Sequence, residues 1–336
     1  EDLPQDYRDT LTSHNLVPLW PSLRAVLPPK IPTRHTQATC WAYQDIRPLL
    51  MRAGDLTPME KAERRVLVLA NPGHGLEKMQ ASAAIYLGMQ LLLPGEWAPS
   101  HRHTPNAVRM IVEGEGAYTT VDGEKCEMAR GDLILTPTGL WHEHGHDGQD
   151  PVVWLDVLDL PLVYYMEASY HINGERQTVQ PGQGDRQNVR AGVAPTRMFE
   201  RNAKAYPMLR YPWAEARAAL LALAADDPSQ DCVQITYVNP QTGADVENVL
   251  GFYALMLRPG QSLRLPARSP SPESAHRPAP PASPPAPPGA APKSAPGWKT
   301  PSSPGTRQRE TRSTRTDRGT DRPTCCGRPS RGGWPH

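Results

Sequence analysis

The chain has 336 residues, 39 prolines and a formal net charge of +1. The charge is unevenly divided: residues 267–336 contain 12 Lys and Arg against 4 Asp and Glu, whereas residues 1–266 contain 24 against 31. Residues 267–336 also lack Val, Ile, Leu, Met, Phe and Tyr, so they cannot bury enough apolar surface to offset the entropy of ordering them. We therefore expect a disordered Pro/Arg-rich tail at 272–336. The mild acidity of the remaining chain argues against a nucleic-acid-binding surface.

The sequence shows no signal for export or membrane insertion. No apolar run approaches the roughly 20 residues of a membrane helix, and residues 1–4 have neither a basic nor an apolar region. The five cysteines lack the spacing of a zinc site or a disulfide framework. We therefore expect a protein of the reducing cytoplasm, with no membrane partner and no nucleic-acid partner.

The first 80 residues are predicted to be mainly helical. Short helices are expected at 7–14 and 19–27, and Thr57-Pro58-Met59-Glu60 has the form of a capping box that starts another helix. The apolar run at 65–70 predicts a first strand, which Asn71-Pro72-Gly73 would end. The sequence therefore predicts a helical N-terminal segment with first strands over 1–80.

From residue 85 to 162 the chain is a series of short apolar runs separated by Gly, Pro or Asp. Strands of this length at a spacing of about 8–12 residues indicate an antiparallel sandwich or barrel. The runs expected as strands are 91–93, 109–112, 117–121, 132–136 and 152–158. An amphipathic helix is expected at 214–225 and a further strand at 234–238.

One segment is repeated. Leu91-Leu-Leu-Pro94-Gly95 recurs 165 residues later as Met256-Leu-Arg-Pro259-Gly260. Continuing this alignment places residues without metal-binding side chains at the second-copy positions of His101 and His103. We therefore expect residues 171–271 to hold linker helices and the start of a second, metal-free copy of the first unit.

Five of the eleven histidines lie between residues 101 and 146. In a strand, residues i and i+2 share a face, so His101 and His103 can present two imidazoles to one point. A third ligand from a distant strand, His142, would complete a facial metal site with open positions. The alternative is that a surface loop has accumulated histidines by chance.

The spacing around these histidines favours the metal site. His101 lies six residues after Gly95, and His142 closes the run Gly131-Asp-Leu-Ile-Leu-Thr-Pro137-Thr-Gly139-Leu-Trp-His142. Both segments resemble the two cupin motifs, Gly-x5-His-x-His and Gly-x5-Pro-x-Gly-x2-His. The resemblance implies a mainly β fold, a double-stranded β-helix or jelly roll, with a metal-binding cupin at 81–170 and a truncated second cupin after it.

The resemblance to cupins has one departure. Most metal-binding cupins place a glutamate ligand three or four residues after the second histidine, where this sequence has Ala107 and Val108. A divalent ion held by three neutral imidazoles keeps its full charge. The site therefore favours an anionic, bidentate substrate over water.

Three segments, 86–109, 112–117 and 141–146, resemble the gentisate 1,2-dioxygenases over a match that covers roughly residues 10–271. This bicupin group also contains salicylate and 1-hydroxy-2-naphthoate dioxygenases. The resemblance implies Fe(2+) and O2-dependent opening of gentisate (2,5-dihydroxybenzoate) between its carboxyl-bearing and adjacent hydroxyl-bearing carbons, with maleylpyruvate as product. It also implies a homo-oligomer, commonly a tetramer, if the second cupin were intact.

Two arginines and a tyrosine are candidates for substrate binding. Arg109 lies six residues after His103, an even offset that would keep it on the same face of a regular strand, and its planar fork matches a carboxylate. The alternative for Arg109 is a surface charge. The resemblance implies a second substrate-contacting arginine at Arg65, although the neighbouring Arg64 or a solvated helix end remains an alternative. By the same resemblance, Tyr86 favours gentisate over salicylate.

Two further residues are candidates for catalysis. His144 shares a strand face with His142 and could hydrogen-bond the substrate hydroxyl, accept its proton, or only support the site. Asp156 lies inside an apolar strand, where an unpaired carboxylate is costly to bury. Its expected partner is an imidazole that it orients.

Two alternatives to gentisate cleavage remain open at this point. One keeps the fold and iron but takes salicylate or 1-hydroxy-2-naphthoate as substrate. The other is a non-catalytic or inactive truncated cupin that binds an aromatic acid. The composition after residue 271 is what a GC-rich gene gives when it is translated out of frame, so a frameshift near codon 270 is one explanation of the tail and a genuine disordered tail is the other.

Overall fold

A computed structural model describes residues 3–20, 27, 30, 33–180, 196–197, 200–201, 205–230 and 232–263. Residues Glu1–Glu273 group into one compact unit. The predicted tail at 272–336 and the proposed frame change near residue 270 lie outside the described residues. Among the described helices, none is long and apolar enough to cross a membrane.

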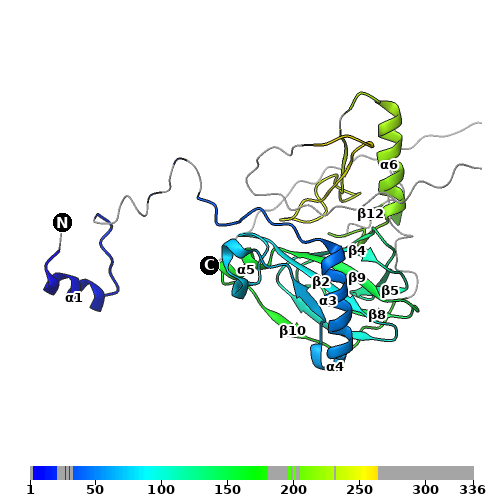
Figure 1. Ribbon diagram of the computed structural model, residues 1–336. Coiled ribbons are helices and arrows are strands. Elements are labelled where there is room, and N and C mark those ends of the chain that lie inside the picture. Colours follow the sequence, from blue (N-terminus) through cyan, green and yellow to red (C-terminus); the bar gives the residue numbers. More distant parts are fainter. Residues whose placement is uncertain are drawn as a thin grey trace, which may run out of the picture. The chain divides into compact units, whose positions relative to one another are not determined.

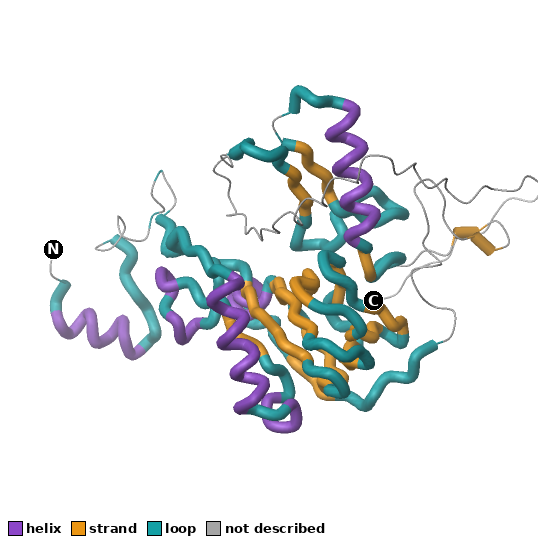
Figure 2. Tube along the Cα trace, turned by 45° about the vertical axis from the view of Figure 1, so that its right-hand side comes forward, coloured by secondary structure: helices purple, strands orange, loops and turns teal. Residues whose placement is uncertain are grey.

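Among the described residues, three helices precede the strands: α1 (Gln5–Ser13), α3 (Tyr43–Leu56) and α4 (Met59–Ala62). The first confirms the helix expected at 7–14, whereas the one expected at 19–27 lies mostly outside the described residues. The sequence analysis missed α3, which contains Pro48, a residue that usually interrupts a helix. Its apolar residues Tyr43, Ile46 and Leu50 nevertheless follow helical spacing and pack against the outer side of β2 (Tyr86–Leu92; Figures 1 and 2).

The predicted capping box is wrong. Thr57 ends α3, where its backbone N–H donates to the carbonyl of Ala53, and α4 begins after Pro58 without a side-chain cap. The tight connection between two helices uses Thr57 as the end of one, so its hydroxyl does not cap the start of the next.

Most of the described strands belong to two large antiparallel sheets (Figure 1). The six-stranded sheet has the order β1 (Val66–Val68), β2, β9 (Val152–Leu158), β4 (Ala107–Glu113), β7 (Leu133–Thr136) and β13 (Arg210–Tyr211). The five-stranded sheet has the order β10 (His171–Asn173), β3 (Trp97–His103), β8 (His142–His146), β5 (Ala117–Val121) and β6 (Glu124–Glu127). This arrangement confirms the predicted mainly β fold with antiparallel strands at 85–162.

The core explains why β9 is apolar along most of its length. Val152 and Trp154 belong to the cluster inside the barrel, whereas Val153 and Leu155 belong to the cluster that α3 covers. A strand buried on both faces has no polar alternation. Burying a large apolar side chain stabilises a fold by roughly 1.5–3 kcal/mol, so β9 is a main contributor to the stability of the barrel.

The remaining elements are short. Two 3-10 turns, η1 (Pro72–His74) and η2 (Leu76–Lys78), follow β1, and α5 (Leu160–Tyr165) follows β9. After it come a hairpin of β11 (Thr196–Arg197) and β12 (Glu200–Arg201), then α6 (Trp213–Asp226), β14 (Val233–Thr236) and β15 (Tyr253–Met256). The helix expected at 214–225 and the strand expected at 234–238 are thus present, and β14 pairs with β15 in a separate two-stranded sheet.

Candidate active site

The structure brings together three of the predicted histidines. His101 and His103 lie on β3, and His142 begins β8 directly opposite His101. Their potential ligand atoms all lie within 4.8 Å of one another. The ring centroids of His142 are 4.1 Å from His101 and 4.7 Å from His103. This group, the histidine cluster, is compact enough to hold one metal ion.

A β-bulge in β3 sets the direction of the cluster. Ala98 lies opposite His144 and His101 lies opposite His142. Between these two pairs β3 therefore contains one more residue than β8. In a regular strand Ala98 and His101 would face opposite sides, but the extra residue lets both face the partner histidines of β8. Pro99, which has no N–H for the sheet ladder, lies within this irregularity.

Backbone carbonyls orient all three imidazoles. The Nδ1 atoms of His101, His103 and His142 lie 3.0, 2.8 and 3.0 Å from the carbonyl oxygens of Pro99, Pro105 and Leu140. Because a carbonyl only accepts, each Nδ1 carries the proton and each Nε2 presents a lone pair. Within the described part of the chain the buried Nε2 of His142 has no hydrogen-bond partner. A metal ion would satisfy this orphaned acceptor, so the residues fit a metal centre.

The surroundings keep the histidine cluster uncharged. Burial lowers the pKa of His101 to about 2, with a further contribution from Arg64, and lowers the pKa of His103 to about 4. Burial also holds the pKa of His142 well below its usual range. Neutral imidazole is the form that binds a divalent cation.

Arg109 and Asp156 form a buried ion pair between neighbouring strands. They lie opposite each other on β4 and β9, with 3.2 Å between Nε and Oδ1, while Nη1 of Arg109 donates to the Thr136 hydroxyl at 2.6 Å. The indole of Trp154 donates to Asp156 at 3.0 Å. The prediction that Asp156 pairs with an imidazole is therefore wrong, because its partners are the guanidinium of Arg109 and the indole of Trp154.

The reason given for placing Arg109 near the cluster is also wrong. His103 ends β3 in the five-stranded sheet and Arg109 lies in the six-stranded sheet, so the chain changes sheets between them and the even offset carries no information. Arg109 nevertheless acts on the cluster, since its charge contributes to the lowered pKa of His103 and of His142.

The structure separates the two adjacent arginines. Arg65 is buried against Glu96, to which it donates two hydrogen bonds of 2.9 and 2.7 Å, and its Nε donates to the carbonyl of Thr57. Arg64 lies toward the histidines instead, with Nη2 3.0 Å from Nε2 of His171. Burial lowers the pKa of Arg64, and the charge of Asp156 opposes that shift.

Of the two arginines left open by the sequence, Arg64 is thus the one that lies toward the histidines. A detectable signal was the alternation along β1, because Arg64 shares parity with Val66 and Val68 and Arg65 does not. Glu63 precedes it with φ of 52°, a left-handed backbone value that non-glycine residues rarely adopt. This turn sends the side chains of 64 and 65 to opposite faces.

Tyr86 and His144 complete the interior. The Tyr86 hydroxyl lies over Gly88, where an added Cβ would come within 2.7 Å of it. Burial and the charge of Asp156 raise the pKa of Tyr86 above its usual range, so the hydroxyl stays protonated. The His144 ring is fully buried, with its centroid 6.1 Å from that of His142, and its Nε2 has no partner among the described residues.

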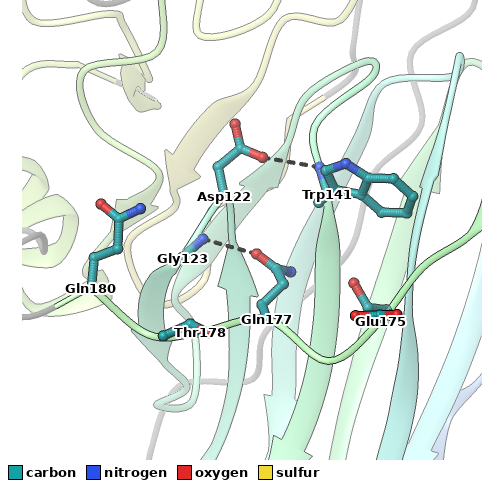
Figure 3. A pocket seen from close by; sticks show the side chains of 8 residues that line it. Asp122, Gly123, Trp141, Glu175, Gln177, Thr178 and Gln180 are labelled. Carbon is teal, nitrogen blue, oxygen red and sulfur yellow. Dashed lines mark hydrogen bonds between the residues drawn. The ribbon is translucent and has the colours of Figure 1, made fainter.

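Two open cavities lie outside the cluster. One of about 570 Å³ is lined by residues that include Ser100, the neighbour of His101 in β3, and Trp141. Figure 3 shows that Gln177, Thr178 and Gln180 line this cavity from one segment, and that Gln177 accepts a hydrogen bond from the Gly123 N–H. The other, about 620 Å³, contains the Lys125–Asp147 ion pair in its lining. Neither is lined by a cluster histidine, so we place the chemistry inside the barrel and not in these cavities.

Comparison with known proteins agrees with this geometry. The Cupin domain family matches residues 88–158. A gentisate 1,2-dioxygenase of a Ralstonia species is 81% identical over 271 residues, which are 81% of this chain and 76% of the relative. Gentisate 1,2 dioxygenase 1 of Aquipseudomonas alcaligenes is 36% identical over 259 residues, covering 75% of this chain and 74% of the relative.

Similarity to solved structures points to the same group of dioxygenases. A salicylate 1,2-dioxygenase from Pseudoaminobacter salicylatoxidans, determined as an adduct with gentisate, superposes with a TM-score of 0.68 at 32% identity, covering 77% of this chain and 74% of that structure. With the cupin match, the antiparallel barrel and the buried histidine cluster, these similarities identify the chain as a member of the gentisate 1,2-dioxygenase family of cupin ring-cleaving dioxygenases.

Proposed function

We propose that this chain catalyses Fe(II)-dependent opening of the gentisate ring with O2, giving maleylpyruvate. The observation that carries the proposal is the neutral histidine cluster with a free buried Nε2, enclosed with two arginines in one interior. The 81% identity to a gentisate 1,2-dioxygenase supports the same substrate.

The proposed iron ligands are the Nε2 atoms of His101, His103 and His142. Iron held there would supply a redox-active Lewis acid with open positions for the carboxylate and ortho-hydroxyl of gentisate and for O2. Three neutral ligands leave the charge of the ion uncompensated, and the nearby carboxylate of Asp156 is already paired with Arg109. The site therefore favours an anionic substrate.

The protein's own groups would bind and orient that anion. We assign substrate binding to Arg64, Arg109 and Tyr86, in place of Arg65, whose guanidinium is held by Glu96. In a buried site of low dielectric constant, a guanidinium binds a carboxylate more strongly than it does in water. Asp156 would act through Arg109, whose guanidinium it holds in place from the adjacent strand. His144 would contact a substrate oxygen.

Oxygen uptake tests the proposal. The full chain is supplied with Fe(II) under air and offered gentisate, salicylate or 1-hydroxy-2-naphthoate in turn, and gentisate is expected to be consumed with formation of a ring-opened keto acid. Turnover of salicylate or the naphthoate with none of gentisate would instead support the alternative substrates. Bound iron without oxygen uptake on any of the acids would support a binding protein without catalysis.

We also propose that the protein is cytoplasmic and that it forms a homo-oligomer if the second cupin is intact. Cys40, Cys126 and Cys232 are free thiols in the described part of the chain, which suits a reducing compartment. Light scattering of the purified chain measures the oligomeric state. A monomer at all concentrations would contradict this part of the proposal.

A further inference from the structure

Four buried or partly buried imidazoles face the same interior, but they are not held in the same way. The imidazoles of His101, His103 and His142 are hydrogen-bonded to backbone carbonyls through Nδ1. The Nδ1 atom of His144 instead lies 2.9 Å from the hydroxyl of Thr119, which is directly opposite it in the β5–β8 pair. Thr119 and His144 are both fully buried.

A hydroxyl differs from a carbonyl because it can also donate. Within the described residues, the contact with His144 is the one hydrogen bond that the Thr119 hydroxyl makes. If Nδ1 of His144 carried a proton, the hydroxyl oxygen of Thr119 would have to accept a hydrogen bond from it. The O–H of Thr119 would then be buried without an acceptor. Such an unsatisfied group costs about 1–3 kcal/mol. The arrangement that satisfies both groups has Thr119 donating to Nδ1.

We propose that Thr119 is a positioning residue that fixes His144 in the tautomer with its proton on Nε2, so that His144 is a hydrogen-bond donor to an anionic oxygen of the bound aromatic acid. Three histidines then offer lone pairs to the metal and the fourth offers a proton to the ligand. Of the roles considered for His144, namely bonding to the substrate, accepting its proton or only supporting the site, this tautomer favours donation of a hydrogen bond to the substrate. That the acid is gentisate rests on the proposed function, but the tautomer does not.

The surroundings of His144 support a free donor. Its Nε2 has no protein partner in the described structure. The Trp154 ring packs 5.2 Å from the imidazole, and its indole N–H is already directed to Asp156. On the other side, the opposing residue of β3 is Ala98, which has no polar side chain to compete. An incoming oxygen is therefore the natural acceptor for Nε2–H.

The first test needs no substrate. Long-range proton–nitrogen correlation spectra of the metal-free full chain, labelled with ¹⁵N-histidine at neutral pH, distinguish the two tautomers of each buried imidazole. We expect one signal set with a bare Nδ1 and a protonated Nε2, absent in His144→Gln and retained in Thr119→Ser. In Thr119→Val, which has a similar shape but no hydroxyl, that tautomer should lose its dominance. A protonated Nδ1 on His144 in the unmodified chain would overturn the proposal even if no variant folds.

The second test measures binding of the acid. Thr119→Val should raise KM for gentisate about tenfold, the equivalent of one lost hydrogen bond, with iron content unchanged, whereas Thr119→Ser should stay within about twofold. Thr120→Val is the matched control, because Thr120 is the adjacent, equally buried threonine on the opposite face of β5. Equal KM changes at 119 and 120, or no change at 119, would refute the positioning role. Absence of gentisate turnover in the unmodified chain would refute the proposed function and leave the tautomer test valid.

Discussion

The repeated strand-and-turn segment appears twice in the molecule, in very different surroundings. The turn glycines Gly95 and Gly260 have nearly the same φ, 78° and 81°. However, β2 is paired on both sides and buried at six of seven positions, whereas β15 pairs with β14 alone and alternates between exposed and half-buried residues. The local sequence thus determines the turn, and the neighbouring strands determine the burial.

The two regions also differ in the partners that they provide for a buried carboxyl group. Asp156 in the barrel has a guanidinium and an indole as partners. Glu247, which lies between β14 and β15, is buried, and its one polar neighbour is the hydroxyl of Tyr206, with no cation beside it among the described residues. Burial raises the pKa of Glu247 to about 8. The barrel therefore pairs its buried carboxylate with a cation, whereas the β14–β15 region keeps its buried carboxyl protonated at neutral pH.

The largest effect is expected at the proposed metal centre, the histidine cluster of the barrel, which has no counterpart in the described part of the β14–β15 region. His142→Ala removes a fully buried proposed ligand, so bound iron and oxygen uptake should both fall to background. Iron is measured by elemental analysis of the purified protein. His146→Ala is the control, because His146 lies on the same strand and bonds to the carbonyl of Asp150. Iron retained by the His142 variant would disprove the assigned ligand set.

The next largest effect compares packing in the two regions. Trp154→Ala, at a fully buried position, should lower the free energy of unfolding by about 3–5 kcal/mol. Tyr253→Ala on β15, where 46% of the residue is exposed, should lower it by less than about 1 kcal/mol. Urea denaturation measures both. Similar losses at the two positions would mean that β15 is as well packed as the barrel.

Glu247→Gln should stabilise the protein above acid pH by about 1–3 kcal/mol, because it removes a buried carboxyl that must take up a proton on folding. The folded-state pKa is raised, so the destabilisation is absent below the ordinary pKa of glutamate, about 4.3, and grows as the pH rises toward about 8. Unfolding curves of both proteins at several pH values test this. A constant difference between the two proteins across that pH range would contradict the assignment to Glu247.

The smallest effect concerns the contact of α3 with the barrel. Arg47, and then Tyr43, lower the pKa of Glu113 through hydrogen bonds. The carboxylate therefore stabilises the fold above its ordinary pKa, and this contribution is lost as the pH falls through the lowered value. Glu113→Gln should cost less than about 1 kcal/mol at neutral pH, because Arg47 is exposed. Thermal unfolding at neutral and acid pH should show the difference disappearing in acid.

The sequence was sufficient for the barrel strands and for the meeting of His101, His103 and His142, because alternation and motif spacing are local properties. It was insufficient wherever a single residue of register or a distant partner decides the outcome. Arg64 and Arg65 are chemically alike, and only their parity with Val66 and Val68 distinguishes them, a signal that requires knowing that the strand follows directly after the turn at Glu63. The partner of Asp156 depends on the pairing of β4 with β9, which joins residues 47 positions apart. The partner of Asp156 is therefore not contained in the local pattern.

The bulge in β3 gives a physical meaning to the fixed distance between Gly95 and His101. Because side chains alternate along a strand, the number of residues in the irregular stretch, rather than their identities, decides which side chains point inward. Inserting one more residue there would turn His101 and His103 outward and bring Ser100 and Arg102 to their inward positions. The motif thus constrains the number of residues between Gly95 and His101 as strictly as it constrains the side chains that bind the metal. Insertions and deletions should be tolerated far less in this short stretch than substitutions.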